Sequence, residues 1–369
     1  MKRLYLDHAA TTPLLPEARE AMLPWLDQFG NPSSLHAEGR AAKDAIDQAR
    51  EILSDSLGCL FAEVLFTSSG TEAANLAILG AALNNSDTKR NRILLGATEH
   101  HCVLHTQPLL KKLGYLVDLL PVDKNSQTKV ENLGDDVLLL SLMHANNETG
   151  AIQPVHEVAE LCRENGVLFH CDAVQTFLKF PLPDADLLTL SAHKVNGPKG
   201  VGAIRIRAGI KLQPLMLGGG QEREMRAGTE NVAGIAGFGA AVHKNRQNPT
   251  NLREIRDGFL VHLSPDAVPT VPDKTQTLDT HAHIRFPGID AETMLIKLDR
   301  MGVAASSGAA CSSGSLEPSH VLLAMGYSPQ EAKEGLRFTF GLGNTFEQAV
   351  EAANRVNQAA DEIRKANRP

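Results

Sequence analysis

A serine, a histidine and a lysine stand close together in the segment Ser191-Ala-His193-Lys194. Residues 187–190, just before it, are mostly apolar and predict a buried strand, and a turn rich in glycine and proline follows. In open α/β sheets, ligands bind at the carboxyl ends of strands. A lysine placed there loses hydration, which lowers the pKa of its amine and makes the amine a nucleophile. A lone lysine in a loop is usually only solvated, so this interpretation depends on its neighbours.

A second predicted strand, residues 64–67, runs into the small residues of Thr67-Ser-Ser-Gly70-Thr71-Glu72. A helix is predicted to begin near Thr71, and its first N–H groups and dipole can bind an anion. Phosphate is the anion most often found at such a junction. The segment is not a Walker loop, because no Gly-Lys-Ser/Thr follows it. Taken alone, this stretch fits an ordinary capped helix equally well.

Three further predicted strands, at 92–96, 137–143 and from Val167 onward, also end in polar side chains. The residues that follow them and could take part in chemistry are His100, Asn147, Asp172 and Gln175. Strands and helices alternate here, which predicts an α/β fold with a mainly parallel central sheet and helices on both faces. Right-handed crossovers place the carboxyl ends of parallel strands along one edge. Polar side chains from five strand ends should therefore converge.

The segment 99–105 gathers one glutamate, three histidines and one cysteine, which could suggest a zinc site. Structural zinc sites normally pair such a cluster with a second one at regular spacing, and the sequence has none. We therefore predict no resident metal. His100, the histidine nearest the strand end, is expected to stack on a planar ligand.

The polar stretch 245–251 predicts a boundary or hinge between two domains. The first would be a large α/β domain of residues 15–250. Residues 1–14 and 251–369 would form a smaller α+β domain. It would carry the loop 306–315, made of small residues around Cys311, and Arg337 on a short strand.

Composition restricts the class of protein. The chain has 369 residues, a formal net charge of −7 and no apolar run long enough to span a membrane. The acidic balance gives no indication of nucleic-acid binding. The N-terminus lacks the apolar core of a signal peptide, and the five cysteines include no C-x-x-C pair. These features predict a cytoplasmic protein with reduced thiols.

The candidate residues together match the needs of one cofactor. A lysine can form a Schiff base, an aspartate can keep a pyridine nitrogen protonated, a helix N-terminus can bind phosphate, and a histidine can stack on a ring. This is the set that pyridoxal 5′-phosphate requires.

The sequence resembles the cysteine desulfurases of the NifS/IscS type, which belong to the class V aminotransferase-like, fold-type I pyridoxal-phosphate enzymes. The resemblance covers nearly the whole chain, and the last motif resembles the branch with the longer cysteine loop. The motifs that carry it are Gly30-Asn-Pro-Ser-Ser34, Thr67-Ser-Ser-Gly-Thr-Glu72, Thr98-Glu-His100, Asn146-Asn-Glu-Thr-Gly150, Asp172-Ala-Val-Gln175, Ser191-Ala-His-Lys194, Arg226-Ala-Gly-Thr229 and Ser306-Ser-Gly-Ala-Ala-Cys311-Ser-Ser-Gly-Ser315.

For the cofactor ring, the resemblance implies that Lys194 forms the Schiff base and that Asp172 binds the pyridine nitrogen. His100 would stack on the ring and move protons. Gln175 and Asn147 would flank the ring hydroxyl and the bound substrate.

For the phosphate, the resemblance implies binding by Gly70, Thr71, Ser191 and His193. Thr229 would reach the phosphate from a second subunit, which implies a homodimer.

For the substrate, the resemblance implies that Arg337, helped by Asn31, binds the carboxylate of L-cysteine. Cys311 would accept the sulfur as a persulfide, and Lys194, Cys311 and His100 would be the catalytic residues. Cys311 could also be a transient ligand of an iron–sulfur cluster.

The implied reaction converts L-cysteine to L-alanine and passes the sulfur to an acceptor protein, such as a scaffold for iron–sulfur cluster assembly. A selenocysteine lyase would need nearly the same site, and another class V aminotransferase-like enzyme would need no thiol at position 311. A non-catalytic assembly scaffold would need neither the lysine, the aspartate nor the cysteine.

Overall fold

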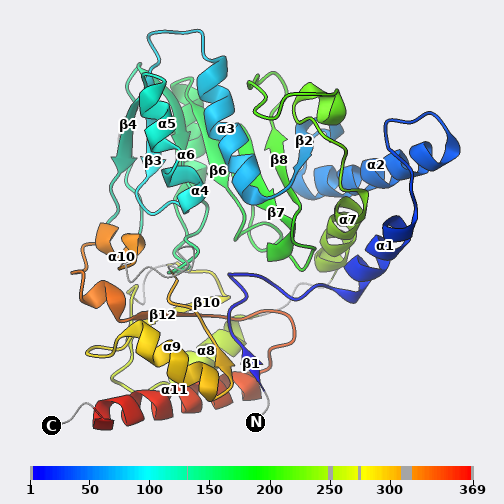
Figure 1. The fold of residues 1–369 in the computed structure, drawn as a ribbon. Helices are drawn as coiled ribbons and strands as arrows, with labels where there is room; N and C mark the ends of the chain where they lie inside the picture. Colours follow the sequence, from blue (N-terminus) through cyan, green and yellow to red (C-terminus); the bar gives the residue numbers. More distant parts are fainter. Residues whose placement is uncertain (1–2, 131, 248–251, 273–275, 309–317, 367–369) are drawn as a thin grey trace.

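The computed structural model describes residues 3–130, 132–247, 252–272, 276–308 and 318–366. The chain forms a large part around a seven-stranded sheet and a smaller part at the carboxyl edge of that sheet (Figure 1). Cys311 lies outside the described residues.

The central sheet is mainly parallel, as the sequence predicts. Only β8 runs antiparallel to both of its neighbours. In spatial order the strands are β2 (Val64–Thr67), β8 (Gly202–Ile206), β7 (Leu187–Ser191), β6 (Leu168–Asp172), β5 (Val137–Ser141), β3 (Arg92–Gly96) and β4 (Leu116–Leu120). Every residue of β5 and β7 is buried, which is expected of parallel strands covered on both faces.

Helices cover both faces of this sheet, because neighbouring strand residues point to opposite sides. On one face, α3 (Gly70–Asn84) packs with Leu65 and Ile93. On the other face, Phe66 and Leu94 pack with residues of α2 (Ala37–Leu57), α6 (Val155–Glu164) and α7 (Val232–Gln247). α1 (Pro16–Asp27) packs against α7. The predicted helices on both faces are thereby confirmed.

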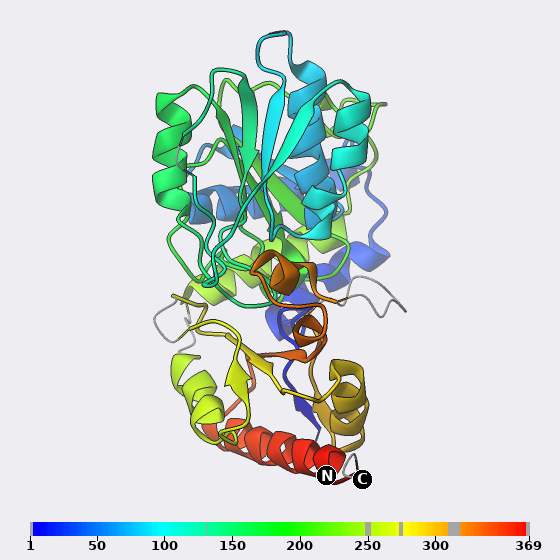
Figure 2. The ribbon, with the colours of Figure 1, turned by 90° about the vertical axis from the view of Figure 1, so that its left-hand side faces the viewer.

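The smaller part has its own apolar core and lies below the sheet edge (Figure 2). Its strands are β10 (His281–Arg285), β12 (Gly335–Thr339) and β9 (Val268–Pro269) in one antiparallel sheet, and β1 (Leu4–Tyr5) paired with β11 (Val303–Ala304). Its helices are α8 (Arg253–Val261), α9 (Ala291–Arg300) and α11 (Phe346–Ala366), and α10 (His320–Ala324) lies between the two parts. The exact domain boundaries, at 14/15 and 250/251, remain a prediction.

Some elements carried too weak a pattern for sequence analysis. Strand β4 is the exposed edge of the large sheet, and Leu116 and Leu119 in it are almost half exposed, so the strand lacks a continuous apolar run. The short helices α4 (His101–Leu104) and α5 (Gln107–Lys112) are one or two turns long. Within the described part of the chain, none of the helices combines the length and apolarity needed to cross a membrane.

Candidate active site

A cavity of about 340 Å³ lies where the parallel strands end, between the large sheet and the smaller part. The structure brings most of the predicted site residues together there. Those that line the cavity are Gly70, Thr71, His100, Asn147, Asp172, Gln175, Ser191, His193, Lys194 and Arg337. Five separate strand ends and one strand of the smaller part supply them, so the predicted convergence of the strand ends is observed.

Lys194 ends a short 3₁₀ helix, Ala192–Lys194, that follows β7 directly. Its Nζ donates hydrogen bonds to the carbonyl oxygens of Ala9 and Ala10. Burial, followed by the charges of Arg337 and Lys179, lowers the pKa of the amine to about 8 from an ordinary 10.5. A lysine with this pKa can release its proton close to neutral pH, as a nucleophile must.

Asp172 is the last residue of β6 and is almost completely buried. Its Oδ1 accepts a hydrogen bond of 2.9 Å from the N–H of Val174. Burial raises the pKa of Asp172 to about 6. An opposite charge in contact favours the charged form of a carboxyl group, so this carboxylate is suited to a cationic partner such as a protonated ring nitrogen.

Glu99 is a second buried carboxyl group close to Asp172. One of its oxygens accepts a hydrogen bond from the N–H of Met143, and Oε2 has no partner among the described residues. Burial, and then the charge of Asp172, raise the pKa of Glu99 well above its ordinary value. Glu99 is therefore the neutral member of the pair, and Asp172 carries the negative charge.

His100 forms the N-cap of α4 at the end of the loop after β3. Its Nδ1 accepts a hydrogen bond of 3.2 Å from the N–H of Cys102, which places the proton of the neutral ring on Nε2. Burial, followed by the charge of Lys194, lowers the pKa of His100 to about 4. The ring is therefore uncharged at neutral pH, a form suited to stacking on an aromatic ligand.

The N-terminus of α3 forms an anion cradle. The N–H groups of Gly70 and Thr71 are among those that a helix leaves without an intrahelical partner. A Cβ atom on Gly70 would lie 3.2 Å from the side chain of Val174 and 3.4 Å from that of Ser191, so the glycine permits a close approach. Ser69 caps the helix by accepting a hydrogen bond from the N–H of Glu72.

His193 faces the same cradle from the turn after β7. Its Nδ1 lies 3.2 Å from the hydroxyl of Thr11, and its carbonyl accepts a hydrogen bond from the hydroxyl of Thr12. Burial, followed by the charge of Lys194, lowers the pKa of His193 to about 4. The N-terminal segment therefore fixes the orientation of this histidine.

Arg337 enters the cavity from β12 and is 3% exposed. Its guanidinium donates to the carboxylate of Asp7 and to the carbonyl of Asn147, both at 2.8 Å. Its Nε has no partner among the described residues. A buried guanidinium with remaining donor capacity can bind a further carboxylate.

Two predicted residues lie elsewhere. Asn31 and Thr229 are both exposed and do not line the cavity of this chain. Cys311 belongs to the residues outside the description. Gly308, three residues before it, lines the cavity.

Three contributors to the site were not predicted from the sequence: the backbone carbonyls of Ala9 and Ala10, the N-cap Ser69, and Asp7. A backbone carbonyl can accept a hydrogen bond whatever the residue type, so the sequence does not reveal it. Asp7 could not be found because it is 330 positions away in sequence from Arg337, which it contacts. Ser69 could have been found, because a serine three residues before a glutamate is a recognised helix start.

The residues present fit pyridoxal 5′-phosphate. The cradle at α3 suits a phosphate, the buried Asp172 suits a protonated pyridine nitrogen, and Lys194 is an amine of lowered pKa. The cavity volume, about 340 Å³, is within the range of small-ligand pockets. The described residues show no cluster of histidine, cysteine, aspartate and glutamate able to hold a metal ion.

The class of enzyme follows from a match to a known protein family. The profile of the family Aminotransferase class-V matches residues 4–351, so the chain belongs to this family. It is an enzyme of fold type I, and its cofactor is pyridoxal 5′-phosphate.

Within this family the chain is similar to proteins of the IscS and NifS type. Putative cysteine desulfurase IscS 1 of Bacillus subtilis is 42% identical, covering 96% of this chain and 98% of that protein. Cysteine desulfurase IscS of Dictyoglomus turgidum is 44% identical, covering 94% and 92%. A solved NifS-like protein superposes with a TM-score of 0.90 at 32% identity, covering 98% of this chain and 100% of the other.

Proposed function

We propose that this protein is a cysteine desulfurase, which converts L-cysteine to L-alanine and retains the sulfur as a persulfide on Cys311. The observation that carries the proposal is the meeting of Lys194, Asp172 and Arg337 around one cavity. Their amine, carboxylate and guanidinium match a cofactor aldehyde, a pyridine nitrogen and an amino-acid carboxylate. The relatives named cysteine desulfurase support the same reaction.

Lys194 and Asp172 would hold the cofactor ring, and the α3 cradle with Ser191 and His193 would hold its phosphate. When bound, the cofactor supplies an aldehyde that bonds to amines and a ring that withdraws electrons. Asp172 keeps a proton on the ring nitrogen, because its negative charge in a buried site stabilises the cationic form. His100 would cover one face of the ring.

Lys194 would also move the substrate proton. Its Nζ has a pKa of about 8, so the neutral amine that can accept a proton is accessible near neutral pH. The carbonyls of Ala9 and Ala10 stabilise the ammonium form once the proton has been taken. The same group can then return the proton to the product.

Arg337 would bind the substrate carboxylate through a paired hydrogen-bonding geometry. Asp7 and the carbonyl of Asn147 already fix two of its nitrogens, so the guanidinium is oriented before substrate arrives. Asn31 does not line this cavity, so its help in binding the carboxylate stays a prediction.

Sulfur transfer would occur at Cys311. Its thiolate attacks the sulfur of the substrate, the C–S bond breaks, an S–S bond forms, and a proton returns to carbon. The cysteine thiol and L-cysteine thus become a persulfide and L-alanine, with no external oxidant or reductant. Gly308, three residues before Cys311, lines the cavity, which supports this assignment.

A free cysteine with a pKa near its reference value of about 8.5 is mostly thiol at neutral pH. We propose that His100 takes the proton of Cys311. Its neutral ring has one basic nitrogen, Nδ1, which the N–H of Cys102 holds at 3.2 Å. That hydrogen bond must be released before the transfer.

We further propose a cytoplasmic homodimer in which Thr229 of each chain completes the phosphate site of the other. Thr229 is exposed in the single chain, as a residue that acts across an interface would be. The persulfide would then be passed to an acceptor protein, for which an iron–sulfur scaffold is the favoured candidate.

The substitution Cys311→Ser tests the proposal. The variant should still change the cofactor absorbance on addition of L-cysteine, because Lys194, Asp172 and Arg337 remain. It should release little alanine, and mass spectrometry should find no persulfide. Cys102→Ser is the matched control, since Cys102 lines the same cavity and should be dispensable. Normal turnover by Cys311→Ser, or a persulfide on Cys102, would contradict the mechanism.

A further inference from the structure

The carboxyl group of Glu148 lies between the two flanks of the segment that carries Cys311. The residues described by the structure end at Gly308 and resume at Pro318. On the later flank, the hydroxyl of Ser319 donates a hydrogen bond of 2.5 Å to Oε2 of Glu148. On the earlier flank, a Cβ atom on Gly308 would lie only 3.0 Å from that same oxygen. One oxygen of Glu148 is therefore close to both flanks of the segment.

The earlier flank is placed at the cavity by Gly308. The φ angle of this residue is +86°, in the left-handed region that favours glycine. Gly308 lines the cavity, and its N–H donates a hydrogen bond of 3.1 Å to the hydroxyl of Ser306. Three residues span at most about 11 Å. The position of Gly308 therefore limits how far the thiol of Cys311 can lie from the cavity.

The same flank is joined to the proposed substrate site. Ser306 and Arg337 exchange two backbone hydrogen bonds in an antiparallel bridge. The guanidinium of Arg337 donates to the carbonyl of Asn147, the residue before Glu148, at 2.8 Å. The start of the Cys311 segment, the turn that carries Glu148 and the proposed carboxylate-binding arginine thus form one connected unit beside the cavity.

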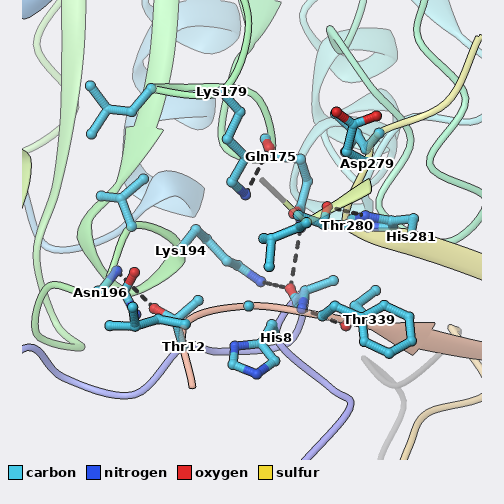
Figure 3. Close-up of a pocket in the computed structure, with 18 of the residues that line it drawn as sticks. His8, Thr12, Gln175, Lys179, Lys194, Asn196, Asp279, Thr280, His281 and Thr339 are labelled. Carbon is cyan, nitrogen blue, oxygen red and sulfur yellow. Dashed lines mark hydrogen bonds between the residues drawn. The ribbon is translucent and has the colours of Figure 1, made fainter. Parts of the chain in front are cut away.

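Both parts of the molecule fix the turn that carries Glu148. The side-chain oxygen of Asn146 accepts a hydrogen bond of 2.9 Å from the N–H of Glu148. Gly150 packs so closely on β10 that a Cβ atom there would lie 2.5 Å from His281. His281 is itself hydrogen-bonded to Thr280, as Figure 3 shows. Glu148 is therefore a fixed point for the two flanks.

The carboxyl group of Glu148 needs an explanation, because burying such a group is costly. Its residue is 1% exposed. Burial raises the pKa of Glu148 to about 7, and the hydrogen bond from Ser319 and the charge of Arg337 oppose this rise. An apolar side chain would fill the same space at lower cost. The contacts with the two flanks explain a carboxyl group here, whereas packing alone does not.

We propose that Glu148 is a positioning residue for sulfur transfer, which holds the two flanks of the Cys311 segment so that the thiol can reach the substrate sulfur. The inference rests on the proposed function and concerns the step after L-cysteine has bound. Glu148 itself does not line the cavity, so it acts through Cys311 and not on the substrate.

The substitution Glu148→Ala removes the contacts with both flanks. We expect the first change in cofactor absorbance to keep its dependence on L-cysteine concentration in stopped-flow measurements. The kcat for alanine, and the rate at which quenched samples gain a persulfide on Cys311, should fall about ten- to a hundred-fold, because a small misplacement of reacting groups costs this much. Glu148→Gln retains an oxygen that can accept from Ser319, so it should restore most of the rate.

Ser319→Ala tests the later contact without removing the buried side chain of Glu148. Ser319 also caps α10 by accepting a hydrogen bond from the N–H of Leu322. Ser328→Ala is the matched control, because the hydroxyl of Ser328 likewise donates to a glutamate, Glu331, at 2.8 Å and accepts from its N–H, away from the cavity. Ser319→Ala should slow persulfide formation, and Ser328→Ala should not. Adding Ser319→Ala to Glu148→Ala should cause little further loss, since the two groups share one interaction.

Persulfide formation at the wild-type rate in Ser319→Ala, or in a folded Glu148→Ala, would overturn the proposal. Weaker binding of L-cysteine with an unchanged kcat would also overturn it, because Glu148 would then serve the substrate site. Wild-type enzyme is the reference in each assay. If it forms no persulfide on Cys311, the proposed function fails too, whereas normal wild-type turnover with unaffected variants overturns only the role of Glu148.

Discussion

The charged form of Asp172 lowers the stability of the folded protein until a cationic ligand binds beside it. Its carboxylate is buried, and burial is the first cause of a pKa raised to about 6 from 3.8. A raised carboxyl pKa means that the folded state binds the proton more tightly than the unfolded state does. The contribution of Asp172 to stability is therefore greatest below about pH 4 and is lost as the pH rises through about 6.

We predict two results for Asp172→Asn. Without cofactor, the variant should gain stability relative to the wild type as the pH rises from about 4 to 6, measured as melting temperature against pH. With cofactor, alanine production should fall roughly 10²- to 10³-fold, as expected when a preorganised electrostatic partner is removed.

Asp136→Asn is the control, because Asp136 carries an exposed ion pair with Arg92. This substitution should have little effect on the pH dependence of the melting temperature or on alanine production. Near-normal turnover of Asp172→Asn would show that another group keeps the ring nitrogen protonated.

For single residues, the sequence predicted which side chains belong to the site better than it predicted the groups that these side chains contact. Lys194 and Asp172 could be found because a polar residue directly follows an apolar strand. The ion pair of Arg337 with Asp7 could not, because the two residues are far apart in sequence and neither has a local pattern that marks the contact. The hydrogen bonds from Lys194 to backbone carbonyls could not be predicted either, because any residue type has such a carbonyl.

Among the elements, helix α3 carries an acidic residue where an anion should bind. Glu72 lies in the first turn of α3, and its carboxylate accepts a hydrogen bond from the N–H of Ser68 at 2.7 Å. A carboxylate so close to a phosphate would repel it. Arg226 compensates by pairing with Glu72 at 2.9 Å. The cradle therefore depends on a residue 154 positions later in the chain.

We predict that Arg226→Met weakens binding of pyridoxal phosphate, because the charge of Glu72 is left uncompensated. The expected loss is roughly ten-fold, in the range of a partly buried charged interaction. Equilibrium titration of apoenzyme with pyridoxal phosphate measures it.

Pyridoxal without phosphate should bind the wild type and Arg226→Met equally, which separates an electrostatic effect from misfolding. Arg163→Met, which removes an exposed pair with Asp184, is the matched control. An equal loss for both ligands would contradict this role of Arg226.

The longer elements were predictable, and the irregular ones were not. Helix α2, Ala37–Leu57, buries residues at the three- and four-residue spacing of an amphipathic helix, such as Ala42, Ile46 and Ala49. The turn at 222–224 has three successive residues with positive φ, and none of them is glycine. Glu222 is held there by a buried, two-contact pair with Arg50 and by the N–H of Phe66. Tertiary contacts override local preference at this turn.

At the scale of the whole molecule, the surface around α1 is unusual. Phe29 and Leu35 are both 90% exposed, and Leu26 is 65% exposed. Large apolar side chains that gather on a surface often mark an interface. Leu26 lies in the last turn of α1, and Phe29 and Leu35 lie between α1 and α2; we propose that these residues belong to the homodimer contact.

We predict that Phe29→Asp shifts the protein from dimer to monomer, because a charge would be buried at the interface. Sedimentation velocity measures the change. Cofactor affinity should fall in parallel, since Thr229 would no longer reach the other chain. Val261→Asp is the control, because Val261 is 80% exposed on α8 of the smaller part. A dimer that persists in Phe29→Asp would assign the interface to another surface.

The overall architecture followed from the alternation of strands and helices, which predicted the mainly parallel sheet. The spatial order of the strands did not follow from that pattern, because β8 turns back between β2 and β7. The pairing of β1 with β11 was also hidden, since two residues in each strand give no periodicity.

The N-terminal segment has a consequence for synthesis on the ribosome. Leu4 pairs with Val303, and the N–H of Ala9 donates to the hydroxyl of Thr339, so this segment has no stable place until those residues have emerged. The central sheet, which ends at Ile206, can form earlier in translation. The carbonyls of Ala9 and Ala10, although synthesised early, would then be the last groups to reach their place beside Lys194. A nascent chain should therefore carry a folded sheet with an incomplete site, and ribosome-stalled chains should gain stable cofactor only after β12 is released.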